Sequence, residues 1–186
     1  MTAQVPETVR IDGTTYALCG VRGEGLFNPE VHGIEPAAPD SSCWRGFICG
    51  YAVNGNRLVL DEIRLWSEPD RGRRNRQLIE DLFGTRLELD DDPSFVHATD
   101  LAYPVLFTGG LLLGDGFFDE LQVRMGFQPA YKYTKVLELT FESGLVLSRS
   151  DRSLEMEEIR LREGRGDGKR SKDVVAWIKD CFRIDY

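Results

Sequence analysis

The segment Asn54-Gly55-Asn56 separates two runs of β-branched, aromatic and aliphatic residues, Trp44–Val53 and Arg57–Trp66. A tight two-residue turn needs positive φ angles, which Asn and Gly adopt at low cost, so this pattern strongly predicts a β-hairpin. A break in the alternation of the second run at Asp61-Glu62 predicts a β-bulge or an early strand end. A second turn signal, Asp12-Gly13, predicts another hairpin. The chain is therefore expected to be rich in β-structure.

The same signals continue through the second half of the chain. Residues Tyr131–Phe141 alternate between apolar and polar side chains, which is typical of a half-exposed strand. The segment Glu142-Ser143-Gly144 predicts a turn into a further strand. Gly109-Gly110 predicts a turn between one strand at Tyr103–Thr108 and a buried one at Leu111–Leu113.

Two segments carry apolar residues at helical spacing on one face. Gln77–Phe83 follows a polar loop at Ser67–Arg76, and Gly84 is placed to end the helix. Ser171–Phe182 predicts a C-terminal amphipathic helix that begins at Ser171. Both helices are expected to cover apolar faces of the sheet.

Two further segments are less regular. Asp115 is placed to begin a short helix that contains Phe117 and Phe118 and ends at Gly126. Leu154–Leu161 is charged and alternating, which fits an edge strand or a helix. We expect Phe117, Phe118 and one face of the strand at 131–141 to lie in the core.

The fold class expected from these elements is α+β. It consists of a predominantly antiparallel sheet of about six to eight strands, curled or two-layered, with two or three short helices including the C-terminal one. The length of 186 residues suits a single globular domain over residues 1–186, since domains typically hold ~100–200 residues. The hydrophobic content of 41% argues against disorder.

The formal net charge is −8, and neither half of the chain is basic. A nucleic-acid partner is therefore unlikely on electrostatic grounds. The charge itself fits a solubility role or an acidic face for a basic partner. The first seven residues lack the pattern of a secretory signal, and Leu101–Gly114, the longest uncharged stretch, is too short to span a bilayer. With four scattered cysteines, these features predict a cytoplasmic protein with reduced thiols and no membrane partner.

The turn-rich segment at residues 20–43 is long and aperiodic, and such loops are often functional or mobile. We take it as a candidate binding loop. The alternative is an irregular segment wrapped over the core and held by Leu26, Phe27 and Ile34. The polar candidates for contact with a ligand or partner are Glu24, Asn28, His32 and Glu35.

A second candidate is a cluster of arginines at the end of the predicted polar loop. Guanidinium groups suit carboxylate or phosphate partners. The alternative is that these side chains are solvated or paired with acidic residues near them in the sequence. The members of the cluster are Arg71, Arg73, Arg74 and Arg76.

The sequence offers few groups for metal binding or catalysis. It has two histidines, His32 and His97, and its closest cysteines, Cys43 and Cys49, lack the spacing of structural zinc pairs. The glycine-rich stretches match neither the dinucleotide fingerprint nor the P-loop. We therefore predict no metal site, no cofactor and no catalytic residues, while His97 with Cys43 or Glu62 is the pair that an enzyme would use.

Three functional hypotheses follow from the sequence. The leading one is a non-enzymatic protein-binding module of a bacterial cytosol, which neutralises a basic partner in the manner of a toxin-immunity protein. The second is a small-ligand-binding β-barrel or sandwich with the 20–43 loop as a lid. The third is a small hydrolase or transferase that uses His97. The oligomeric state does not follow from the sequence.

The segments before Leu60 and Leu147 resemble each other, as Val-Asn-Gly-Asn-Arg-Leu-Val-Leu and Phe-Glu-Ser-Gly-Leu-Val-Leu. Similar turn chemistry between two apolar strands accounts for this resemblance. An ancient duplication accounts for it as well.

Overall fold

The structure is a computed structural model that describes residues 2–87, 92–122, 124, 126–163 and 184. The strands of this part are β1 (Thr8–Ile11), β2 (Thr14–Glu24), β3 (Phe47–Asn54), β4 (Arg57–Trp66), β5 (Phe95–Ala98), β6 (Tyr103–Pro104), β7 (Thr108–Phe117), β8 (Tyr133–Glu142) and β9 (Leu145–Asp151). The helices are α1 (Gly72–Phe83) and α2 (Ser153–Glu163), with 3₁₀ turns η1 (Pro29–His32), η2 (Asp119–Leu121) and η3 (Ala130–Lys132).

The strands form one curled, mixed sheet. Its neighbours pair in the order β3-β1-β2-β7-β8-β9-β4-β5, and β3 pairs with β4 as well, so seven of the strands make a closed cycle of pairings. Among the strands named above, β1 and β3 are the only neighbours that run parallel. The cycle closes between β9 and β4 through the single pair Arg57 and Leu145. The predicted α+β class with a curled, mostly antiparallel sheet is thus confirmed.

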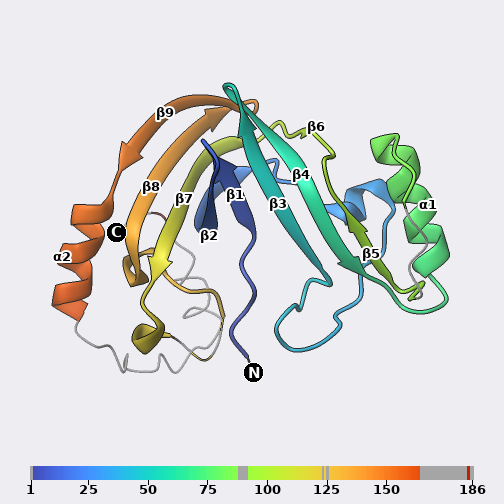
Figure 1. Cartoon of the computed structure of the whole chain (residues 1–186), viewed down its shortest axis with the longest axis horizontal. Helices are drawn as coiled ribbons and strands as arrows, with labels where there is room; N and C mark the ends of the chain where they lie inside the picture. The colour runs from blue at the N-terminus through green and yellow to red at the C-terminus, as the bar shows by residue number, and fades with distance from the viewer. Residues whose placement is uncertain (1, 88–91, 123, 125, 164–183, 185–186) are drawn as a thin grey trace.

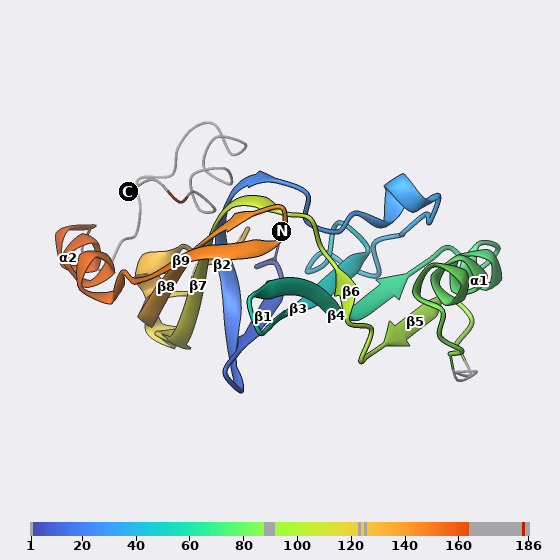
Figure 2. The same cartoon turned by 90° about the horizontal axis from the view of Figure 1, so that it is seen from above.

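Figure 1 shows this sheet as two arms that meet at the top of the view and splay apart below. One arm holds β7, β8 and β9 with α2 at its outer side, and the other holds β3, β4 and β5 with α1 beside them. Figure 2 shows from above that α1 and α2 lie at opposite ends of the molecule.

The two arms are joined by the tips of the two similar hairpins. The Leu58 amide donates a hydrogen bond to the Gly144 carbonyl at 2.8 Å, and the Val146 amide donates one to the Asn56 carbonyl at 3.0 Å. The Gly55-Asn56 turn confirms the hairpin predicted there, although the first strand begins at Phe47. A duplication as the origin of the two hairpins stays a hypothesis.

The predicted bulge in the second strand of the main hairpin is confirmed. Gly50 pairs with Glu62 while Tyr51 pairs with Leu60, so Asp61 is the extra residue of β4. A bulge of this kind changes which side chains share a face downstream of it. It therefore fixes where Glu62 lies relative to β5.

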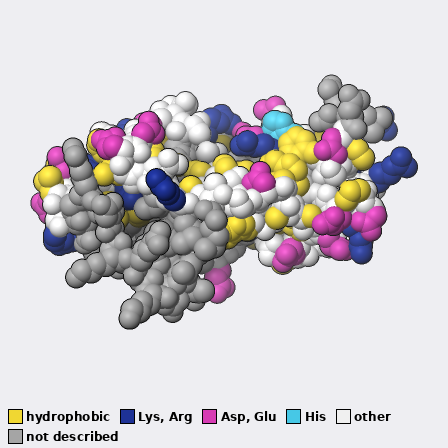
Figure 3. Space-filling view, turned by 90° about the horizontal axis from the view of Figure 1, so that it is seen from below, with side chains coloured by type: hydrophobic (Ala, Val, Ile, Leu, Met, Phe, Trp, Pro, Cys, Tyr) yellow, Lys and Arg dark blue, Asp and Glu magenta, His cyan; other side chains and the backbone are white. Residues whose placement is uncertain are grey.

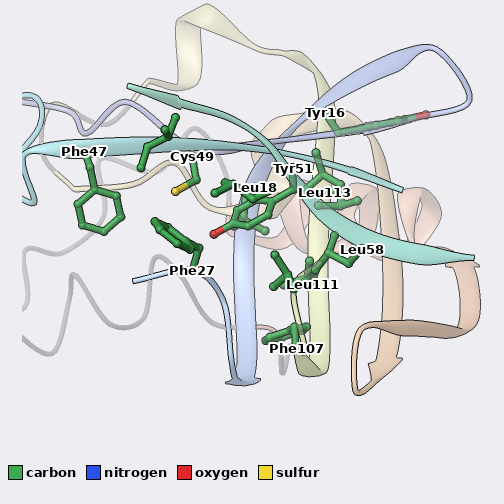
Figure 4. Close-up of a cluster of buried hydrophobic side chains, with 14 of the residues drawn as sticks. Tyr16, Leu18, Phe27, Phe47, Cys49, Tyr51, Leu58, Phe107, Leu111 and Leu113 are labelled. Carbon is green, nitrogen blue, oxygen red and sulfur yellow. The ribbon is translucent and has the colours of Figure 1, made fainter. Parts of the chain in front are cut away.

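The inner face of the curled sheet is packed with apolar side chains from both arms (Figure 4). Figure 4 shows Phe27, from the segment after β2, facing Cys49 and Tyr51 of β3. The interpretation of that segment as one held by core residues is thereby supported, because Phe27 and Ile34 are buried in this cluster. Leu137, Leu139 and Phe141 of β8 lie here too, as predicted.

A second apolar cluster lies on the opposite face of β2, β7 and β8. Met156 and Ile159 of α2 cover it. Tyr133 belongs to this cluster and Phe117 packs against it. Phe117 and Phe118 are both only partly buried, so neither is the fully buried core residue that we predicted. Its buried members are Cys19, Leu112, Ala130, Tyr133, Val136, Met156, Ile159 and Ile184.

Two predictions about glycines were wrong. Residues 20–24 belong to β2, and Gly109-Gly110 lies inside β7 rather than in a turn. A Cβ atom at Gly23 would lie 2.1 Å from the Thr108 carbonyl oxygen, and one at Gly109 would lie 2.0 Å from the Arg22 carbonyl oxygen. The backbones of β2 and β7 therefore approach so closely at these glycines that there is no room for a side chain.

Other expectations for the second half need correction as well. In the described residues between Asp115 and Gly126, where we predicted a short helix, the structure has no α-helix. The chain stays extended to Phe117 and then forms only the 3₁₀ turn η2, because Gly116 has a positive φ. Leu154–Leu161 is helical, since the Asp151 carboxylate accepts a hydrogen bond from the Ser153 amide at the start of α2. The helix predicted at Ser171–Phe182 lies outside the described residues.

Candidate functional site

The arginine cluster lies on a helix and not in a loop. We predicted a polar loop over Ser67–Arg76, but α1 begins at Gly72, so Arg73, Arg74 and Arg76 are helical and Arg71 is the N-cap residue. Arginine is a good helix former, but a helix start that is rich in arginine shows no periodicity of apolar residues. The prediction from apolar spacing therefore began the helix too late. The start of the helix packs against the segment just before β5, since a Cβ at Gly72 would lie 2.0 Å from the Pro93 carbonyl oxygen.

The structure joins this helix to the candidate loop through Asn75, which is fully buried. The Asn75 side-chain NH₂ donates to the Glu35 carbonyl oxygen and to the Ser67 hydroxyl, both at 2.8 Å. The Glu35 amide donates to Asn75 Oδ1 at 3.1 Å. One buried side chain thus satisfies both backbone groups of Glu35 and fixes the loop on the helix.

The Glu35 side chain is exposed and meets two of the arginines. Its Oε1 accepts hydrogen bonds from Arg71 Nη1 at 3.0 Å and from Arg74 Nη1 at 2.8 Å. The side chains of all three residues are about half exposed, at 51%, 43% and 55% for Glu35, Arg71 and Arg74. The candidate loop and the candidate cluster, predicted independently, therefore form one charged network on the surface.

Two other candidates of the loop have structural contacts. Asn28 is the N-cap of η1, where its Oδ1 accepts a hydrogen bond from the Glu30 amide at 3.1 Å. The His32 ring stacks on Phe27 with 5.3 Å between ring centroids and 12° between planes. Phe27 in turn contacts Phe83 of α1 and Tyr103 of β6. Both candidates shape the loop from which Glu35 projects.

The remaining candidates are not drawn into the Glu35 network. Glu24 is the exposed last residue of β2, opposite Thr108. Arg76 donates from Nη2 to the Phe95 carbonyl at 3.4 Å. Arg73 is exposed and makes no ion pair with any residue in the described part of the chain. Figure 3 shows acidic and basic side chains interspersed at the end of the molecule that holds α1.

A separate polar group lies on the other face of β4 and β5. His97 Nε2 is 2.8 Å from Glu62 Oε1, and Arg64 Nε is 3.2 Å from the same oxygen. The register pairs Arg64 with His97, and Trp66 with Phe95 beside them. His97 and Glu62 are 45% and 33% exposed. Of the two partners predicted for His97, Glu62 is the one that lies within hydrogen-bond distance, on an open sheet surface.

The three cysteines within the described residues, Cys19, Cys43 and Cys49, are buried and poorly suited to nucleophilic catalysis. Burial raises the pKa of Cys19 and of Cys43, and burial together with the Glu7 carboxylate raises the pKa of Cys49 well above its ordinary value. Since the thiolate is the nucleophile, these thiols are inert. No cysteine is a hydrogen-bond partner of His97 in the described residues.

Glu7 is itself a buried carboxylate, 5% exposed, at the start of β1. Arg45 Nη2 donates to its Oε1 at 2.9 Å, and the Arg45 guanidinium lies over the Phe47 ring at 4.8 Å. Burial raises the pKa of Glu7 in spite of this partner. The pair ties the N-terminal segment to the connection before β3.

Sequence reasoning missed Asn75 and Glu7. Asn75 lies four residues before buried Ile79, so a polar residue on the apolar face of a correctly bounded helix would have indicated a buried anchor. Glu7 lies two residues before buried Val9 on the same strand face. In each case the sequence analysis placed the start of the element too late or left it undefined, so the buried polar residue near that start was not recognised.

The described residues show neither a metal-binding cluster nor a membrane-spanning helix. Within them, no group of three or more His, Cys, Asp or Glu side chains is placed to hold a metal ion. None of the helices in this part of the chain has the length and apolar character needed to cross a membrane.

The fold and site define a curled α+β protein with a charged surface where a loop meets α1. Comparison with protein-family models, with curated proteins and with solved structures finds no match to this chain.

Proposed function

We propose that this protein is a non-enzymatic protein-binding module, which neutralises or sequesters its partner in the manner of a toxin-immunity protein. The partner docks on the arginine surface, which we define as Val31, Glu35, Arg71, Arg73 and Arg74. The carrying observation is the Glu35 network, in which a loop and a helix that are distant in sequence present exposed charges from a fixed backbone.

The chemistry of this surface suits protein recognition. Buried Asn75 holds the backbone of the loop in place, so little conformational entropy is lost on binding. Arginines are enriched at the centres of protein interfaces, and Val31 adds an apolar side chain that is 75% exposed. The net charge of −8 speeds the encounter with a basic partner in the cytosol.

The proposal is tested with a photo-crosslinking amino acid placed at Arg73 in the full chain and exposed to lysate of the source organism. The matched control places the same amino acid at Ser150, an exposed position on β9 in the opposite arm. We expect one protein to be captured stoichiometrically from position 73 and not from position 150. Equal capture at both positions, or capture at neither, would count against the proposal.

The contact between His97 and Glu62 favours a second candidate function, a small hydrolase or transferase. When the proton of the neutral imidazole is on Nε2, His97 donates it to Glu62 Oε1, and Nδ1 is then the nitrogen that can act as a general base. The test compares the protein with His97→Ala on chromogenic esters and phosphoesters. Turnover that disappears in His97→Ala supports an enzyme, and turnover that is absent or unchanged removes this candidate.

A further inference from the structure

The first turn of α1 carries an unusual charge pattern. It contains no acidic residue, its N-cap Arg71 makes no side-chain capping bond, and Arg73 and Arg74 follow at once. The N-terminus of a helix has a partial positive charge, so cations there are unfavourable and anions are favourable. The only carboxylate that bonds to Arg74 in the described part of the chain is Glu35, which comes from a loop 39 residues away.

Glu35 uses only part of the hydrogen-bonding capacity of Arg71 and Arg74. A single oxygen, Oε1, accepts from one Nη1 of each arginine, whereas a guanidinium can bind a carboxylate through two parallel N–H groups. Asp70 is close to Arg71 as well, but at 3.6 Å from Nε. Both arginine–glutamate pairs are half exposed, and exposed pairs of this kind contribute little to stability. Another carboxylate can therefore compete for the same arginines.

The backbone geometry allows Glu35 to leave without opening the loop. Asn75 binds the amide and the carbonyl of Glu35 and not its carboxylate. Rotation of the Glu35 side chain into solvent keeps all three Asn75 hydrogen bonds. The site can therefore change occupant at the cost of two exposed ion pairs only.

We propose that Glu35 is an internal competitor, which occupies a carboxylate site on Arg71 and Arg74 until an acidic segment of the partner displaces it. This inference rests on the proposed function and names the partner chemistry at its centre, an Asp- or Glu-rich peptide segment. Arg73, in the same helical turn, is exposed and adds a further positive charge to this end of α1. A partner that is basic overall is compatible with it, because net charge steers the encounter over long distances while one acidic segment sets the register of docking.

The test uses a fluorescein-labelled hexaglutamate peptide and fluorescence anisotropy at low salt, with the full chain. We expect Glu35→Gln to bind the peptide about two- to fivefold more tightly than Glu30→Gln, because the two ion pairs that Glu35 makes are exposed and contribute little each. Glu30→Gln is the matched control, because Glu30 lies on η1, is exposed and loses the same charge without an ion pair among the described residues. The double variant Arg71→Gln/Arg74→Gln should bind more weakly than Arg57→Gln/Arg149→Gln, which removes two charges elsewhere.

Two results would overturn the inference. Equal affinities of Glu35→Gln and Glu30→Gln would show that Glu35 does not compete, while leaving the crosslinking result at position 73 unaffected. A hexalysine peptide that binds the protein and loses affinity in Glu35→Gln, but not in Glu30→Gln, would show that Glu35 is itself the ligand of a basic segment. Circular dichroism and the Tm of each variant establish that the fold is retained.

Discussion

Replacement of Asn75 by alanine should detach the loop from α1 and destabilise the protein. The substitution removes three hydrogen bonds, with donor–acceptor distances of 2.8, 2.8 and 3.1 Å. At about 1 kcal/mol each, with an added penalty for partners left unpaired, the expected loss is about 2–4 kcal/mol of the free energy of unfolding. For a chain of this size the Tm should fall by roughly 5–15 °C.

The measurement is urea unfolding followed by circular dichroism, together with hydrogen exchange of residues 29–37. Exchange in this segment should accelerate more than exchange in β7 or β8, because the lost bonds are local to Glu35. Gln77→Ala is the control, since Gln77 is exposed on the same helix and, within the described residues, its side chain bonds only to Asp81, at 2.9 Å. A loss within about 0.5 kcal/mol of that control would refute the assignment of Asn75 as the anchor.

Three further predictions concern other parts of the fold. Burial raises the pKa of Glu7, so its stabilising contribution is present below the pKa of an unfolded glutamate and is lost as pH rises through the higher folded pKa. The protein should therefore lose stability relative to Glu7→Gln as pH rises above the ordinary glutamate pKa, and parallel pH profiles of the two proteins in urea unfolding would contradict this. In a Cys181→Ser background, native protein should react with a thiol reagent only on unfolding, because the three remaining thiols are buried, and rapid native labelling would show otherwise. Gly23→Ala should cost about 2–4 kcal/mol by urea unfolding and Gly13→Ala about 1 kcal/mol, since both have positive φ but only the first would meet the backbone of β7; similar costs would disprove the close-approach role.

The hairpins were predictable because their turns are local. Gly55 and Gly144 have positive φ angles in two-residue turns, and the adjacent residues carry the required signal. The bulge at Asp61 was predictable for a similar reason, as a break in alternation. The roles of Gly23 and Gly109 were not, because a glycine needed for a turn and one needed for close strand approach are identical in sequence.

The candidate site was predictable as a set of residues but not as an arrangement. Glu35 and the arginines were chosen for exposure and charge, and those properties follow from composition alone. Their contact depends on Asn75, whose importance follows only once α1 is known to begin at Gly72. Glu35 and Asn75 are about 40 residues apart in the sequence, and no local periodicity indicates such a contact. It becomes visible only in the three-dimensional structure.

The residue that stabilises the loop, Asn75, is a different one from the exposed residues that we propose to bind the partner. This difference allows experiments to distinguish the two proposed functions. Asn75 is buried and neutral, so its hydrogen bonds to the loop backbone contribute strongly to the free energy of unfolding. Glu35 and its arginines are exposed, so their ion pairs contribute little to it. A binding surface built in this way should tolerate Glu35→Gln without loss of fold and respond to it in affinity. The contact between His97 and Glu62 lies on the opposite face of β4 and β5 and shares no residue with the arginine surface. An effect of Glu35→Gln on binding and an effect of His97→Ala on turnover are therefore independent, and the first without the second identifies a binding module.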